Sequence, residues 1–110
     1  MEYKFTSDNF EAEVINSEIP VLVDFYADWC GPCKMMMPVV EKMAETYDGK
    51  VKVGKVNSDD ENALAAKYNI MSIPSFLVFK NNLCCYVDNL AFNKLLEIHF
   101  YNLMLSCIIV

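Results

Sequence analysis

Two cysteines with two residues between them, Cys30 and Cys33, are the side chains best placed to carry chemistry in this chain. Sulfurs at this spacing can close a small disulfide or supply half of a zinc site. A zinc site needs a second pair of ligands, and the adjacent Cys84 and Cys85 do not have the usual ligand spacing. The pattern therefore favours dithiol–disulfide chemistry, with a structural zinc half-site as the alternative.

The segments on either side of the cysteines indicate how they are positioned. An apolar run typical of a strand, residues 21–27, precedes them, and a run typical of a helix, residues 34–47, follows. At a strand-to-helix junction, free backbone N–H groups and the positive end of the helix dipole face the sulfur. Such a site lowers the pKa of a thiol from its usual value of about 8.5. We therefore expect a reactive thiolate at neutral pH.

Strand-like and helix-like segments alternate along the chain, which is typical of an α/β domain whose sheet is parallel at its start. Ser7 and Asp8 are both candidate N-caps for the first helix. The strands are expected at residues 3–5, 21–26, 51–56, 76–79 and 83–87, and the helices at about 8–16, 33–48, 61–68 and 92–105.

The composition limits the class of protein. A chain of 110 residues is long enough for one domain, and 55% hydrophobic residues can supply its core. A net charge of −6 argues against a nucleic-acid partner. The N-terminal residues do not resemble a signal peptide, and the apolar residues 95–110 fall short of the roughly 20 needed for a membrane span. We expect a cytoplasmic protein whose five cysteines are not a disulfide framework.

The run Ala27-Asp28-Trp29-Cys30-Gly31-Pro32-Cys33-Lys34 resembles the active-site signature of the thioredoxin family, and the resemblance extends from about Phe5 to Asn81. It implies a thioredoxin fold, with a central mixed β-sheet flanked by helices on both faces. It also implies a protein-disulfide reductase that needs no bound cofactor beyond its own Cys30–Cys33 disulfide. Thioredoxin reductase would supply the electrons, and disulfide-containing client proteins would receive them.

The resemblance also assigns roles to the site residues. Cys30 would attack the client disulfide, and Cys33 would then attack Cys30 to release the reduced client. Gly31 and Pro32 would form part of the client-binding loop. An uncharged proline between the cysteines implies a reductant, thioredoxin itself being the reference case for a low potential. Trp29 would also contact the client, as a lid beside the disulfide. The alternative is that Trp29 is a partly buried core aromatic.

Four further residues complete the expected site. Asp24 lies within an apolar strand, where burial should raise its pKa. By resemblance Asp24 would accept the proton of Cys33, and Lys55 would lie near it; the alternatives are a carboxylate at the rim and a lysine on the surface. Pro74 matches a cis-proline of the family, with Ile73 before it, beside the client peptide.

The segment from Asn81 to Val110 departs from the family pattern, although we assign residues 1–110 to one domain. It holds three of the five cysteines, and the turn at residues 81–82 has Asn where the family usually has Gly. Its last helix would be almost entirely apolar, which suggests dimerisation or another partner. One hypothesis is that this segment arose through a change of reading frame or a fusion, and not from the ordinary family sequence. We expect Cys84, Cys85 and Cys107 to be free thiols. We expect His99 to have no catalytic role.

Two other functions remain open from the sequence. A disulfide isomerase or oxidase would use the same cysteines at a higher potential. A non-catalytic interaction module with a thioredoxin-like fold would instead bind a partner through the apolar C-terminal segment.

Overall fold

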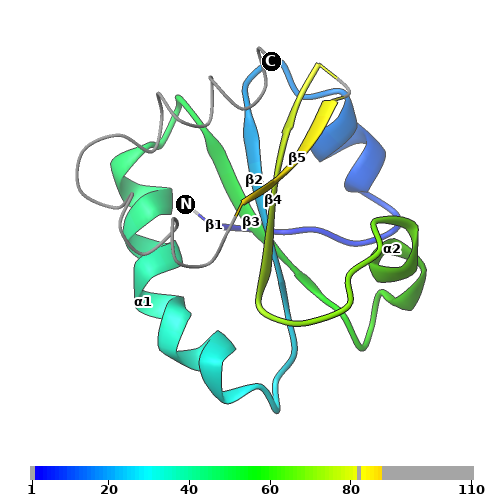
Figure 1. Cartoon of the computed structure of the whole chain (residues 1–110). Helices are drawn as coiled ribbons and strands as arrows, with labels where there is room; N and C mark the ends of the chain where they lie inside the picture. The colour runs from blue at the N-terminus through cyan, green and yellow to red at the C-terminus, as the bar shows by residue number, and fades with distance from the viewer. Residues whose placement is uncertain (1, 82, 88–110) are drawn as a thin grey trace.

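A single mixed sheet organises the computed structural model, which describes residues 2–81 and 83–87 (Figure 1). Its strand order is β1-β3-β2-β4-β5, with β1, β3 and β2 parallel and β4 and β5 each antiparallel to its neighbour. The prediction of a mixed sheet is confirmed. The elements are β1 (Glu2–Lys4), the π-helix η1 (Glu11–Ile15), β2 (Val21–Tyr26), α1 (Gly31–Thr46), β3 (Lys52–Asn57), α2 (Asn62–Lys67), β4 (Ser75–Lys80) and β5 (Leu83–Val87).

The sheet is covered on both faces, as Figure 1 shows: α1 lies on one side, and η1 and α2 lie on the other. Successive side chains of a strand point to opposite faces, so β2 contributes to both layers. Leu22 packs in the layer under α1, whereas Val21, Val23 and Phe25 pack in the layer under η1 and α2. The strand is buried on both faces, which is why its sequence is a nearly continuous apolar run.

The α1 helix begins two residues before the predicted start at Cys33. Cys30 is its N-cap, with extended backbone angles, and Pro32 lies in its first turn. Proline suits this position because its missing N–H would have no partner inside the helix. The first turn of α1 therefore includes the whole loop between the two cysteines.

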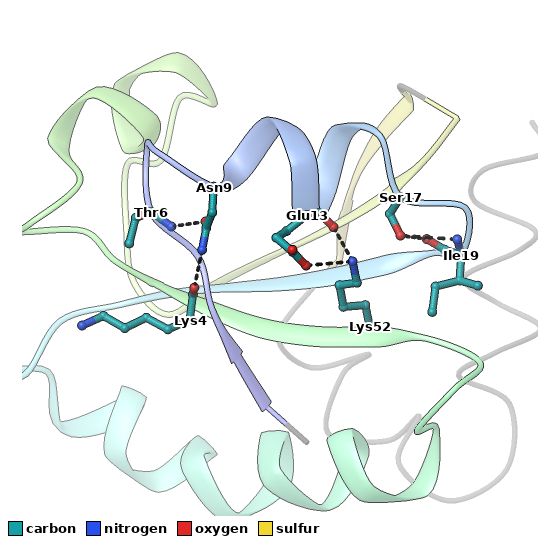
Figure 2. Close-up of polar contacts among 7 residues, drawn as sticks. All are labelled: Lys4, Thr6, Asn9, Glu13, Ser17, Ile19 and Lys52. Carbon is teal, nitrogen blue, oxygen red and sulfur yellow. Dashed lines mark hydrogen bonds and ion pairs between the residues drawn. The ribbon is translucent and has the colours of Figure 1, made fainter.

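The predicted capping of the first helix by Ser7 or Asp8 is wrong. The residue before η1 is Phe10, with no side-chain cap. The Ser7 hydroxyl instead donates to Glu61, 2.8 Å away and 54 residues along the chain. Asn9 holds the local turn (Figure 2). Its side chain accepts a hydrogen bond from the Thr6 N–H at 2.7 Å and donates one to the Lys4 carbonyl.

A second set of polar contacts ties η1 to the sheet. The Lys52 ammonium lies 3.1 Å from the Glu13 carboxylate and donates to the Glu13 carbonyl at 2.8 Å (Figure 2). Beyond η1, the Ser17 hydroxyl donates to the Ile19 carbonyl at 2.8 Å, which shapes the approach to β2. The Lys52–Glu13 contacts join η1, in the layer opposite α1, to the start of β3.

The predicted edge strand at residues 83–87 is confirmed as β5. Asn81 adopts a positive φ of 52°, as expected for the turn that precedes β5. Cys84 is a free, exposed thiol, but Cys85 is bonded, so the prediction of a free thiol is wrong for Cys85. The predictions for the helix at 92–105, for its dimerisation, and for His99 and Cys107 lie outside the described residues.

Within residues 2–81 and 83–87, none of the helices has the length and apolar character required to cross a bilayer.

Candidate active site

The two cysteines of the motif form a disulfide at the N-terminus of α1. Their Cα atoms are 5.2 Å apart, and the backbone N–H of Cys33 donates to the Cys30 sulfur over 3.2 Å. Each sulfur is bonded to the other, which leaves neither as a thiolate ligand for zinc. In the part of the chain that the structure describes, no group of three His, Cys, Asp or Glu side chains is arranged to hold a metal.

The peptide before Pro74 lies against this disulfide. The Ile73–Pro74 bond is cis, as predicted, and the Ile73 carbonyl oxygen is 3.8 Å from the Cys30 sulfur. Ile73 also packs on a small buried cluster made of Ala27 and the two cysteines. The structure thus brings together two segments that are more than 40 residues apart in the chain.

Trp29 is exposed beside the disulfide, with 71% of its surface open to solvent. Its indole N–H donates to the Asp59 carboxylate over 2.9 Å. The backbone N–H of Asp59 in turn donates to the Asn57 side chain at 3.0 Å. The alternative that Trp29 is a core aromatic is therefore wrong. Its ring is exposed and is anchored by the hydrogen bond to Asp59.

An open groove of about 350 Å³ begins at Trp29 and runs along the segment before Pro74. Met71 lies along it with 93% of its surface exposed. The groove is lined by Trp29, Ser58, Ala65, Ile70, Met71, Ser72 and Ile73. It passes next to the disulfide, because Ile73 both lines the groove and contacts Cys30.

Asp24 lies in the middle of β2 and is 4% exposed. One of its carboxylate oxygens, Oδ1, has no hydrogen-bond partner among residues 2–81 and 83–87. The pKa of Asp24 is raised to about 7. Burial is the main cause, the negative charge of Glu2 adds to it, and the positive charge of Lys55 opposes both. The predicted rise in pKa is confirmed, and the alternative of a carboxylate at the rim is wrong.

Lys55 is adjacent to Asp24 through the pairing of the strands. The two residues are direct partners in the parallel register of β2 and β3. The Lys55 ammonium lies 3.6 Å from the Glu2 carboxylate and 5.2 Å from the centre of the Tyr26 ring. Its side chain is 28% exposed, which is intermediate between the surface position and a buried one.

A cavity of about 130 Å³ joins the buried carboxylate to the disulfide. Asp24, Lys55 and Cys33 all line it, which brings together three of the residues expected to act in proton transfer. Its remaining lining residues are Glu2, Tyr26, Ala27, Asp28, Lys34 and Met37.

Two residues of this region were not predicted from the sequence. Glu2 pairs with Lys55, and Asp59 anchors Trp29. The signal for Asp59 was its place in the turn 57–60, directly after a strand that ends beside the motif. Glu2 had no such signal, because its contact depends on the register between β1 and β3.

A mixed sheet that carries a buried Cys-x-x-Cys disulfide at a helix N-terminus, beside a cis-proline, defines a thiol–disulfide oxidoreductase. Comparison with known proteins agrees with this class. The family model described as Thioredoxin matches residues 2–95. The chain belongs to the thioredoxin family, and its activity is that of a protein-disulfide reductase.

Individual relatives give the same result. The chain is 53% identical over 76 residues to a thioredoxin of Porphyra purpurea, a match that covers 69% of this chain and 71% of the relative. It is 51% identical over 73 residues to a thioredoxin of Haemophilus influenzae, covering 66% and 68%. It is 52% identical over 73 residues to the chloroplastic thioredoxin M5 of Oryza sativa, covering 66% and 42%.

Proposed function

We propose that the chain reduces client disulfides through a cycle of its two cysteines. The Cys30 thiolate attacks one sulfur of the client disulfide, which forms a mixed disulfide and releases the client's other sulfur as a thiolate that takes up a proton. Cys33 then loses its proton, and its thiolate attacks Cys30. The bond between Cys30 and the client breaks, the Cys30–Cys33 bond forms, and the second client thiolate leaves and is protonated.

One observation carries this assignment: the Cys30 sulfur accepts a hydrogen bond from the Cys33 N–H at the start of α1. A donor aimed at the sulfur favours the thiolate over the thiol, as does the positive end of a 16-residue helix. Both cysteines are nearly buried, at 4% and 3% exposed, so exposure does not separate them. Cys33 lies inside α1, whereas Cys30 precedes the helix and contacts Ile73 of the groove, which suits Cys30 for the first attack and Cys33 for the second, internal one.

Asp24 is the proposed proton acceptor for Cys33, with Lys55 beside it. A carboxyl whose pKa is near 7 exchanges protons readily at neutral pH. The cavity that both residues line has room for water, since a single water needs only about 10–15 Å³ by the same kind of measure. Water in the cavity would carry the proton from the Cys33 sulfur to Asp24.

The client would bind across the groove beside the disulfide. We assign client binding to Trp29, Gly31 and Pro32 together with Ile73 and Pro74. Trp29 and Ile73 both line this groove. When Cys30 is reduced, its thiol can donate to the Ile73 carbonyl 3.8 Å away. An extended client segment there would meet exposed apolar side chains on both sides.

Thioredoxin reductase is the proposed electron donor, and the redox-active disulfide is the only redox group that we assign to the cycle. We place the protein in the cytoplasm, a reducing compartment, which suits the free thiol of Cys84.

Reduction of insulin by the oxidised chain, with dithiothreitol as electron donor, tests this function. Cys30→Ser should lower the rate to that of dithiothreitol alone. Cys33→Ser, reduced beforehand and mixed with insulin in the absence of dithiothreitol, should instead trap a mixed disulfide with the client, visible as a mass adduct. Cys84→Ser is the matched control, since its exposed thiol lies on β5, and it should leave the rate unchanged.

The alternatives predict other results. A non-catalytic interaction module would give no reduction by the unmodified chain. An isomerase or oxidase would reduce insulin poorly, and its Trp29 fluorescence would report a transition in the oxidising range during a redox titration.

A further inference from the structure

Glu2 was not among the residues predicted to act at the site, yet it lines the same cavity as Asp24 and Lys55. We propose that Glu2 is a positioning residue for proton transfer: its carboxylate holds the Lys55 ammonium at the wall of the cavity and limits how far that ammonium neutralises Asp24. This inference rests on the proposed role of Asp24 as proton acceptor for Cys33.

The strand register places the three charges on one face of the sheet. Glu2 is the partner of Val53, and Lys55 lies two residues further along β3, so Glu2 and Lys55 point to the same side. Lys55 is in turn the partner of Asp24 across the parallel pair of β3 and β2. All of these side chains point toward α1, because Val53 packs in the layer under that helix.

Two contacts hold the Lys55 ammonium. The Glu2 carboxylate lies 3.6 Å from it, and the face of the Tyr26 ring lies 5.2 Å from it. The side chains of Glu2 and Lys55 are only 20% and 28% exposed. Salt and water screen such a pair less than one at an open surface, so removal of the Glu2 charge should be felt at Asp24.

The charges around Asp24 give the direction of the effect. Glu2, from β1, raises the pKa of Asp24, and Lys55, from β3, lowers it. The same cavity is faced by one further acid and one further base, Asp28 and Lys34, at the motif and on α1. On the outer side of Glu2, α1 adds two exposed acids, Glu41 and Glu45.

Without its negative charge, position 2 would no longer oppose the ionisation of Asp24, and the ammonium would be free to approach Asp24. Both changes stabilise the carboxylate, so Asp24 would ionise at lower pH. The Asp24 carboxylate would then be available to accept the proton of Cys33 at lower pH, although it would be a weaker base. Glu2 therefore sets the pH range of the step that releases the client.

The test is the carboxyl ¹³C NMR titration of Asp24 in the oxidised full-length chain. Glu2→Gln keeps the side-chain shape and should lower the pKa of Asp24, by up to about one unit. Lys55→Gln should raise it. The matched control is Glu13→Gln, which removes the partner of Lys52, the other paired lysine of β3, and should leave the titration of Asp24 unchanged.

A second readout follows the step itself. A mixed disulfide is formed between Cys30 and a small aromatic thiol, and the pH dependence of its resolution by Cys33 is measured by stopped flow. Its acidic midpoint should move to lower pH in Glu2→Gln by the same amount as the titration.

An Asp24 titration in Glu2→Gln that matches the unmodified chain would overturn the proposal, and so would an equal shift in Glu13→Gln. A shift of the titration without a shift of the resolution step would overturn it as well. The titration uses oxidised protein without client, so its outcome is independent of the insulin assay that tests the proposed function.

Discussion

The two faces of the sheet in this thioredoxin-family protein are built differently. Under η1 and α2 the layer is mostly apolar and rich in aromatic rings, and Phe10 meets both Phe5 and Phe79 edge to face. Under α1 the layer is mostly aliphatic, and the same strand β2 places the buried Asp24 there. One face contributes mainly packing, whereas the other carries a buried carboxyl that folding must accommodate.

This difference shows how a small domain combines stability and reactivity. A buried carboxylate without full hydrogen bonding opposes folding, and Asp24 Oδ1 has no partner among the described residues. Within that same part of the chain, no buried carboxyl lies on the opposite face, whose packing can offset the penalty. The predictions below test this division between the faces.

The largest effect is expected on the apolar face. Phe25 is fully buried there, so Phe25→Ala should lower the free energy of unfolding by about 3–5 kcal/mol through lost burial and a cavity. Guanidinium denaturation of the oxidised protein measures it. The control Leu83→Ala, at a side chain 55% exposed on β5, should cost about 0.5 kcal/mol or less. Equal losses at both positions would contradict the proposed role of the apolar face.

On the α1 face, replacement of the acid should stabilise the fold. Because the pKa of Asp24 is raised from 3.8 to about 7, the folded state holds a proton that the unfolded state releases between these values. Stability from this residue is therefore present below about pH 4 and is lost as the pH rises to about 7, by up to about 4 kcal/mol.

Asp24→Asn keeps an uncharged side chain at all pH values and should remove that loss. The difference in unfolding free energy between the variant and the unmodified chain should grow from pH 4 to pH 8 in favour of the variant. Glu41→Gln, at an exposed position of α1, serves as control and should show no such trend. A constant difference across the range would mean that Asp24 is not protonated in the fold near neutral pH.

The same two faces explain what the sequence was able to predict. The strand Val21–Tyr26 was predicted with its correct ends, because a strand buried on both faces is an uninterrupted apolar run. The spacing of Cys30 and Cys33 was enough to identify them as candidates for redox chemistry. The roles of Asp24 and Pro74 were predicted only through the family resemblance.

What failed depended on contacts between distant segments. The local pattern predicted Ser7 as a helix cap, but its hydroxyl donates a hydrogen bond to Glu61 instead. Glu2 reaches Lys55 only through the register of β1 and β3, which no local pattern contains. Long-range pairing of this kind has no signal in a window of ten or fifteen residues, so a single sequence does not reveal it.

A smaller effect is expected at Gly54, on β3. A Cβ there would overlap the ring of Phe5 and lie 2.9 Å from the Cβ of Tyr3. Gly54→Ala should therefore cost about 1–3 kcal/mol by overpacking the apolar face. Phe5→Leu removes the overlapping ring atoms, so the double variant should lose less than the sum of the two single losses in denaturation. Strict additivity would show that this contact does not limit position 54.

The smallest effect compares the two paired lysines of β3, one for each face. Lys52 points to the η1 face, where its partner Glu13 is 40% exposed, whereas Lys55 points to the α1 face. Glu13→Gln should cost less than about 1 kcal/mol, because the Glu13 side chain is itself exposed and its charge is screened. Lys52 also keeps its bond to the Glu13 carbonyl and its place over the Tyr3 ring. Denaturation at low and high salt should show the loss shrinking as salt rises. A loss independent of salt would mean that Glu13 stabilises η1 by packing rather than by charge, and that only the α1 face of β3 uses a lysine pair electrostatically.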